Sequence, residues 1–159
     1  MGNNKLLNEK KVVEYLKSKF IPQLKKQYPQ HPLVNQRQDK LLKFIKKYKA
    51  THPYFLKFDI EKYYININHN ICLKVLNDNY KLLTNNHPPL PLINIIKTDI
   101  KVFLSGSIYK TQGLALGNSL SYLLSYLYLL SLDLKIKEPF LRYADDYVIF
   151  FKSKKQIYH

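Results

Sequence analysis

The chain has 159 residues, of which 46% are hydrophobic and 23% are charged, and this ordinary globular composition excludes a disordered polymer. Its single cysteine, Cys72, excludes an internal disulfide and a cysteine zinc cluster. The 26 Lys and Arg residues outnumber the 11 Asp and Glu residues and give a formal net charge of +15. So basic a protein is expected to bind polyanions, of which nucleic acid is the commonest, although an AT-rich coding sequence would also favour lysine over arginine.

The sequence predicts no export signal and no membrane span. The first residues lead into a mixed, charged segment between Lys5 and Lys11 rather than into an apolar one. The most apolar stretch, residues 119–134, is too short to cross a bilayer and contains serines and Asp133. We therefore expect a soluble, intracellular protein with no membrane partner.

The first 53 residues are predicted to be helical. In residues 5–28, apolar side chains fall near one face and lysines fill the other, with Pro22 as a candidate kink or end. A loop at residues 29–32 precedes a second amphipathic helix, residues 36–49, which ends in a lysine cluster. We interpret these lysines as a solvated face, with phosphate binding as the alternative.

The middle of the chain combines one strand with further helices. Residues 54–58 predict a strand that ends at Asp59, and Asn68 is the expected cap of a helix over residues 71–83. The remaining predicted elements are a helix over residues 92–98, a hairpin formed by residues 101–104 and 107–110, a glycine-bracketed loop over residues 113–118 and a buried helix over residues 119–134.

Residues 140–151 place two adjacent carboxylates, Asp145 and Asp146, between two runs of β-branched and aromatic residues. The pattern predicts a hairpin whose tight turn carries both aspartates. Burying two unpaired carboxylates would be unfavourable by several kcal/mol, so a cation is expected beside them, and Mg²⁺ prefers hard oxygen ligands. The alternative is an ordinary hairpin turn, in which Asp is a common residue.

The order of these elements predicts an α+β fold, an antiparallel sheet with helices packed on one face. If the strand that ends at Asp59 lies beside the hairpin, three carboxylates converge at one edge and repel one another. Two Mg²⁺ ions about 3.5–4 Å apart would neutralise them, and could activate a hydroxyl while stabilising a leaving phosphate. On a basic protein, this arrangement favours phosphoryl or nucleotidyl transfer.

Three segments resemble, in order, the palm motifs of reverse transcriptases. Residues 58–64 (FDIEKYY) and 67–71 are similar to the first motif, and residues 113–121 (GLALGNSLS) with the following helix resemble the second. Residues 142–146 (RYADD) resemble the catalytic turn. Each segment alone is weakly specific, but the three together are strongly so, and they span residues 54–152. The Gly-Asn form of the second motif is most similar to bacterial and phage enzymes, including the diversity-generating retroelement branch.

The resemblance implies a polymerase palm at residues 54–159, preceded by a reduced, fingers-like helical region at residues 1–53. It also implies an RNA-directed DNA polymerase that adds dNTPs to the 3′-hydroxyl of a DNA or RNA primer on an RNA template. Asp59 and Asp145 would hold two catalytic Mg²⁺ ions, for which Mn²⁺ could substitute. Asp146 would support one ion or the primer end, and the Ile60 carbonyl would be a further ligand.

The resemblance also places the incoming nucleotide between two segments. The backbone N–H groups of Lys62 and Tyr63 would face the triphosphate, and the Tyr64 ring would be the gate that excludes a ribose 2′-hydroxyl. Gly117 would let the backbone approach the templating base. Leu116 takes a position where many relatives carry glutamine, and an aliphatic residue there resembles the error-tolerant diversity-generating branch. The alternatives are core packing for Tyr64 and loop packing for Leu116.

The chain departs from the family pattern at both ends. Arg37, the only arginine before Arg142, does not map onto the basic fingers motif of full-length relatives. Only thirteen residues follow Asp146, so the lysine-bearing palm motif, the primer grip and the thumb are expected to be missing, and a second chain could supply the thumb. The resemblance further implies a cytoplasmic protein encoded by a prokaryote or a phage.

Two alternatives to the DNA polymerase stay open. The first is a non-catalytic or degenerate palm-fold fragment that binds nucleic acid, which the departures at both ends favour and the intact carboxylates oppose. The second is an RNA-dependent RNA polymerase, which would share the carboxylates. Tyr64 argues against it, because such enzymes need a polar group there to accept the 2′-hydroxyl.

Overall fold

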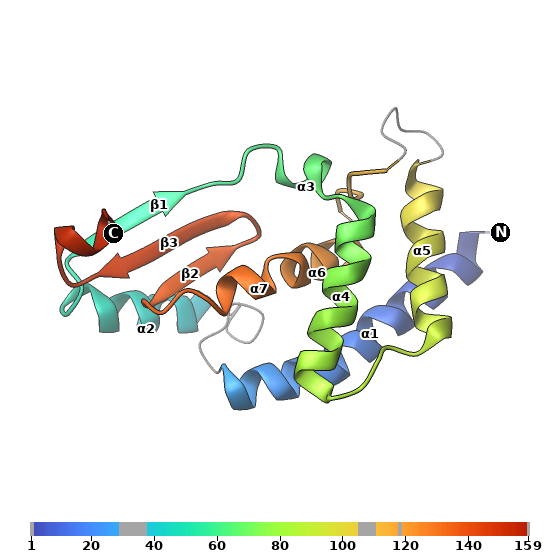
Figure 1. The fold of residues 1–159 in the computed structure, drawn as a ribbon, viewed down its shortest axis with the longest axis horizontal. Coiled ribbons are helices and arrows are strands. Elements are labelled where there is room, and N and C mark those ends of the chain that lie inside the picture. Colours follow the sequence, from blue (N-terminus) through green and yellow to red (C-terminus); the bar gives the residue numbers. More distant parts are fainter. Residues whose placement is uncertain (1, 29–37, 105–110, 118, 159) are drawn as a thin grey trace.

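A small sheet lies at one end of the molecule, and most of the helices gather at the other (Figure 1). The computed structural model describes residues 2–28, 38–104, 111–117 and 119–158. Within them, strands β1 (Tyr54–Phe58), β2 (Phe140–Tyr143) and β3 (Asp146–Phe151) form an antiparallel sheet in the order β1-β3-β2. The predicted strand, the predicted hairpin and the α+β fold class are thereby confirmed.

Helices make up most of the rest of the described chain. They are α1 (Gly2–Gln27), α2 (Gln38–Lys49), α3 (Tyr63–Asn66), α4 (His69–Thr84), α5 (Leu90–Leu104), α6 (Ser119–Tyr128), α7 (Leu130–Asp133) and a short 3₁₀ helix, η1 (Lys154–Ile157). Pro22 lies inside α1 and does not end it. The predicted cap of α4 is confirmed, because the Asn68 side chain accepts a hydrogen bond from the backbone N–H of Ile71 at 3.1 Å.

One predicted strand is wrong. Residues 101–104 form the last turn of α5 rather than half of a hairpin, and α5 extends beyond both predicted ends. Leu92 and Ile96, one helical turn apart, are both buried, so tertiary packing anchors this helix. A short apolar run such as Val102 to Leu104 fits a strand and a buried helix equally well by periodicity. The other half of the predicted hairpin, residues 105–110, lies outside the described residues.

The predicted buried helix over residues 119–134 is interrupted. Helix α6 ends at Tyr128, Leu129 has φ −93° and ψ −1°, and α7 then carries the chain to Asp133. The interruption falls one turn before Asp133, a buried carboxylate in an otherwise apolar stretch.

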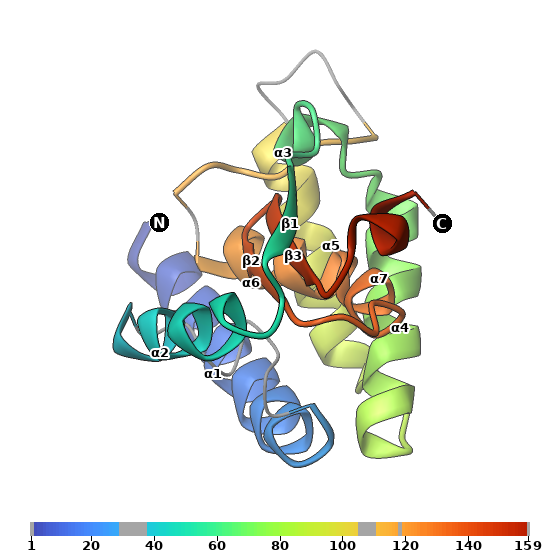
Figure 2. The same cartoon turned by 90° about the vertical axis from the view of Figure 1, so that its left-hand side faces the viewer.

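The core lies between α1, α4, α6 and the inner face of the sheet. Buried side chains of α1, at Val12, Val13, Leu16, Phe20 and Leu24, join those of α4 and α6 in a single cluster. Figure 2 shows the strands nearly end-on, with α2 on one side and α4 and α7 on the other. None of the helices in the described ranges is both long enough and apolar enough to cross a membrane.

Strand β3 is central, and its register defines two faces of the sheet. Phe58 of β1 pairs with Tyr147, and their rings stack with centroids 4.9 Å apart on the buried inner face. The outer face is more open, and Tyr143 on it is 72% exposed. At the far end of the sheet, Phe44 of α2 contacts Phe150, with ring centroids 6.1 Å apart.

Candidate active site

The sheet register brings the three predicted aspartates to one end of the sheet. Because Phe58 pairs with Tyr147, the next step along both strands sets Asp59 beside Asp146. Asp145 occupies the turn between β2 and β3. Burial raises the pKa of Asp145, and the nearby carboxylates of Asp59 and Asp146 raise it further, against the lowering effect of a backbone hydrogen bond. This end of the sheet therefore holds negative charge that lacks full compensation.

The carboxylate of Asp146 forms an ion pair with a lysine. The Lys57 ammonium lies 3.5 Å from Asp146 Oδ1, and both side chains are about half exposed or more. Across the described residues, no three His, Cys, Asp or Glu side chains are arranged to hold a metal ion. An exposed ion pair of this kind contributes only about 0–1 kcal/mol, so Asp146 can exchange Lys57 for another cation at little cost. The oxygen donors of Asp59, Asp145 and Asp146 fit Mg²⁺ chemically, and the metal would have to draw Asp146 away from Lys57.

The turn that carries Asp145 has a strained backbone. Ala144 has φ +53°, a left-handed conformation that is unfavourable by roughly 1–2 kcal/mol for a residue with a Cβ. Two hydrogen bonds hold this residue: Arg142 Nη1 donates to the Ala144 carbonyl at 2.8 Å, and the Ala144 N–H donates to the Tyr126 hydroxyl at 3.0 Å. Strain that persists at such a position indicates surroundings that fix the turn.

A buried ion pair lies directly beneath this turn. Arg142 Nε donates to Asp133 Oδ1 at 3.0 Å and Nη2 donates to Oδ2 at 2.5 Å, and neither side chain is exposed. The Tyr147 hydroxyl donates to Asp133 Oδ1 at 2.7 Å, and Nη2 also donates to the Tyr126 carbonyl at 3.1 Å. Burial lowers the pKa of Arg142, but Asp133 together with Tyr147 and Tyr126 raises it, and because the net pKa lies above its ordinary value the guanidinium stays charged.

Sequence reasoning missed this pair. In the sequence, Arg142 stands out only as part of the turn motif, and Asp133 only as an interruption of an apolar helix. A charged residue inside an otherwise apolar helix is nevertheless an available signal, because such a group is almost never fully buried without a partner.

The segment after β1 turns sharply into α3. Lys62 has φ +51°, again a left-handed conformation for a residue with a side chain. Tyr63 is buried, and its hydroxyl donates to the Ser125 carbonyl on α6 at 2.5 Å. The Tyr64 hydroxyl lies 2.9 Å from Ser125 Oγ, which itself donates to the Tyr122 carbonyl. Because a serine hydroxyl has one proton, Tyr64 is the donor to Ser125, and its ring is fixed at both ends.

The glycine-bracketed loop is joined to this same segment. Gly113 N–H donates to the Ile67 carbonyl at 2.8 Å, and Leu114 N–H donates to the Tyr64 carbonyl at 2.9 Å. His69 Nε2 lies 2.7 Å from the Gly113 carbonyl, and because that oxygen can only accept, Nε2 carries a proton. These hydrogen bonds join the glycine-bracketed loop to the segment that contains Tyr64, so the two segments expected beside the nucleotide are in direct contact.

The tip of this loop is open. Leu116 is 80% exposed, so packing within the loop does not account for its side chain. Gly117 has φ +77°, and a Cβ added there would meet no atom within 4 Å. Backbone conformation, rather than crowding, is therefore what favours glycine at this position.

Comparison with known proteins gives one clear result. Residues 4–159 match the family described as "Reverse transcriptase (RNA-dependent DNA polymerase)", which is nearly the whole chain. A comparison with curated proteins gives no match.

Proposed function

The chain belongs to the reverse transcriptase family, and from this premise we propose that it performs templated nucleotidyl transfer with its carboxylates at the turn. In this reaction the 3′-hydroxyl of a primer attacks the α-phosphate of a dNTP and pyrophosphate leaves. The observation that supports it best is the sheet register, which sets Asp59 beside Asp146 and next to the turn that carries Asp145. In agreement with it, the Asp59 carboxylate raises the pKa of Asp145 beyond the effect of burial. The direct test is primer extension on an RNA template with Mg²⁺, compared with the same mixture containing excess chelator.

Asp59 and Asp145 are the proposed holders of two Mg²⁺ ions, with Mn²⁺ as a substitute. Asp146 and the carbonyl of Ile60 complete the proposed ligand set. Bound ions would supply charge neutralisation for the attacking and leaving oxygens. The protein itself would keep the carboxylate oxygens of Asp59, Asp145 and Asp146 together at one end of the sheet, where a primer–template could reach them.

The nucleotide is proposed to lie between α3 and the glycine-bracketed loop. The N–H groups of Lys62 and Tyr63 would face the triphosphate, and the Tyr64 ring would lie under the sugar. Leu116 and Gly117 would contact the base pair being formed. The exposure of Leu116 and the hydrogen bonds that join this loop to the Tyr64 segment support the placement.

Tyr64→Ala is expected to lower the preference for dNTP over rNTP by about tenfold to a hundredfold, because the ring excludes the 2′-hydroxyl by volume. Tyr64→Phe and Ser125→Ala are the matched controls, since each removes the bond between Tyr64 and Ser125 but keeps the ring. Both should leave the preference nearly unchanged. The measurement is the ratio of kcat/KM for the two sugars, and equal use of both by the wild type would rule out a gate.

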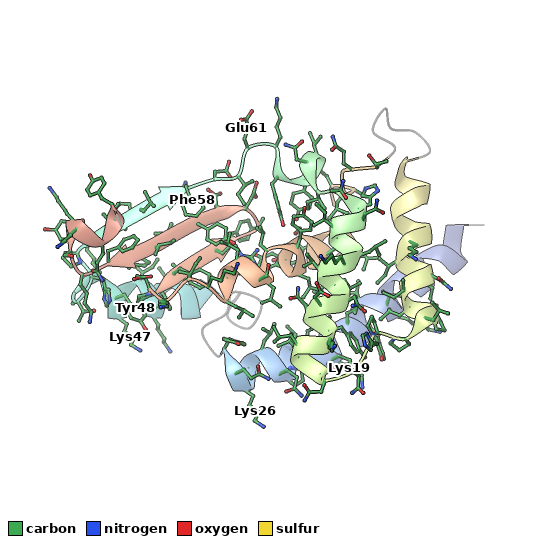
Figure 3. All side chains as sticks on the ribbon, viewed as in Figure 1. Lys19, Lys26, Lys47, Tyr48, Phe58 and Glu61 are labelled. Carbon is green, nitrogen blue, oxygen red and sulfur yellow. The ribbon has the colours of Figure 1, made fainter. Side chains whose placement is uncertain are left out.

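The proposed partners are an RNA template and a DNA or RNA primer. The net charge of +15 favours them, and exposed lysines are spread over α1 and α2. In Figure 3, Lys26 and Lys47 point away from the ribbon. Lys57 and Lys62, at 63% and 69% exposed, precede and follow Asp59 in the chain and pair with Asp146 and Glu61, and both would contact phosphates near the reacting end.

Binding of a labelled RNA–DNA hybrid is expected to weaken steeply with salt. The slope should be about 0.7–0.9 log units of affinity per log unit of salt for each phosphate that a lysine neutralises, because counterions are released on binding. Lys57→Gln should reduce that slope by the amount of one phosphate contact, about 0.7–0.9. Lys19→Gln on α1 should reduce it by less, because Lys19 is not among the lysines next to the aspartates. An affinity that stays flat between low and physiological salt would show that the basic surface serves another purpose.

We further propose that residues 1–53 are a fingers-like helical region and that residues 54–159 belong to the palm. The cytoplasm of a prokaryote or a phage-infected cell is the proposed location. The alternative of a non-catalytic nucleic-acid-binding palm draws on one observation within the described residues, the pairing of Asp146 with Lys57 in place of a three-carboxylate set. Nucleic-acid binding without any metal-dependent extension would favour that alternative.

A further inference from the structure

The buried contacts beneath the Asp145 turn go beyond what a folded hairpin requires. A two-residue hairpin turn normally relies on glycine or asparagine where φ is positive, yet Ala144 takes that place here. Its carbonyl and its N–H are both bound from below, by Arg142 and by the Tyr126 hydroxyl. Hydrogen bonds from side chains therefore stabilise the positive φ that a glycine or asparagine would usually supply at this position.

The same contacts are rigid because their own partners are fixed. Asp133 at the end of α7 holds Arg142 through two of its nitrogens, and the Arg142 guanidinium carbon lies 4.3 Å from the centroid of the Tyr126 ring. Arg142 and Asp133 have no exposed side-chain surface. A planar guanidinium can bind a carboxylate and a carbonyl at once, which a lysine ammonium cannot do with the same geometry.

We propose that Arg142, anchored by Asp133 and aided by Tyr126, is a positioning residue that holds the Ala144–Asp145 turn so that the Asp145 carboxylate stays beside Asp59. None of these three residues is proposed to touch metal or substrate. The inference rests on the proposed function for its catalytic consequence, but the positioning itself is a property of the metal-free chain. The contacts between α6, α7 and the hairpin would thus arrange the carboxylates.

Tyr126→Phe is the sharpest test, because a change at Arg142 or Asp133 could simply unfold the protein. The variant keeps the ring beside Arg142 and removes the hydroxyl, which accepts from the Ala144 N–H and also hydrogen-bonds the Tyr122 side chain. Tyr80→Phe is the matched control: Tyr80 is also buried, and its hydroxyl binds the hydroxyl of Tyr15, between α4 and α1. Both variants lose a tyrosine hydroxyl and should unfold at slightly lower temperatures.

Three measurements separate the two variants. Tyr126→Phe should speed hydrogen exchange at the Ala144 amide, weaken Mn²⁺ binding measured by paramagnetic resonance about fivefold, and lower kcat by a similar factor with an unchanged KM for dNTP. Tyr80→Phe should match the wild type in all three. Equal Mn²⁺ affinity and equal kcat in the two variants would overturn the inference. If the wild type extends no primer, the proposed function fails, while amide exchange and Mn²⁺ affinity still decide the positioning role.

Discussion

Asp145→Asn is expected to slow primer extension by about a thousandfold or more while leaving the metal-free fold at least as stable as that of the wild type. The loss of activity follows from removing a proposed ligand of both ions. The stability follows from the electrostatics of the turn, where burial and the neighbouring Asp59 disfavour the charged form of Asp145. An asparagine keeps the shape of the side chain and removes the repulsion.

The pH dependence gives this prediction a second readout. The folded-state pKa of Asp145 is raised above its ordinary value of about 3.9, so its contribution to stability is present below that value and is lost as pH rises through the raised pKa. In the presence of a chelator, the wild type should therefore lose stability relative to Asp145→Asn over that rise. Thermal unfolding of both proteins between about pH 3 and 8 measures it. A variant that is less stable than the wild type at pH 7 would contradict the assignment.

Elements with a strong local signal could be predicted from the sequence. The strand from Tyr54 to Phe58 and the hairpin around Asp145 combine β-branched or aromatic runs with polar ends, and both formed where expected. The Asn68 cap is likewise a local effect, since one side chain and one backbone N–H suffice to make it. Residues 101–104 carried no such signal, and in the structure they continue the helix α5, which is anchored by Leu92 and Ile96.

In the candidate site, the locations of the aspartates could be predicted from the sequence, but their side-chain contacts could not. Asp59 was located at a strand end, and Asp145 and Asp146 in a hairpin turn, by local sequence patterns. These patterns were enough to expect all three at one edge of the sheet. The contacts of the site did not follow, because Lys57 reaching Asp146 and Ser125 receiving the Tyr64 hydroxyl depend on neighbours that are close only in the folded chain. The Asp133–Arg142 pair is of this kind, since its members come from different elements.

Breaking that buried pair is expected to give the largest loss of stability. Asp133→Leu leaves a buried guanidinium without its counter-ion, and Arg142→Met leaves a buried carboxylate, so each should lower the free energy of unfolding by about 3–5 kcal/mol. For a chain of this size, that corresponds to a melting temperature lower by about 10 °C or more. Lys57→Met is the contrasting control, because its exposed pair with Asp146 should contribute no more than about 1 kcal/mol.

A variant that lacks both charges tests whether the two are coupled. Asp133→Leu with Arg142→Met removes both charges together, and adding Tyr147→Phe removes the hydroxyl that would otherwise lose its acceptor. Because two well-packed apolar side chains can replace a buried ion pair at little net cost, this combination should recover most of the stability lost in either single variant. It should not recover activity, because the Ala144 carbonyl has lost the Arg142 donor. If the combined variant loses as much free energy of unfolding as the two single variants added together, the two charges are not coupled. If it keeps the wild-type kcat, the pair serves the fold alone.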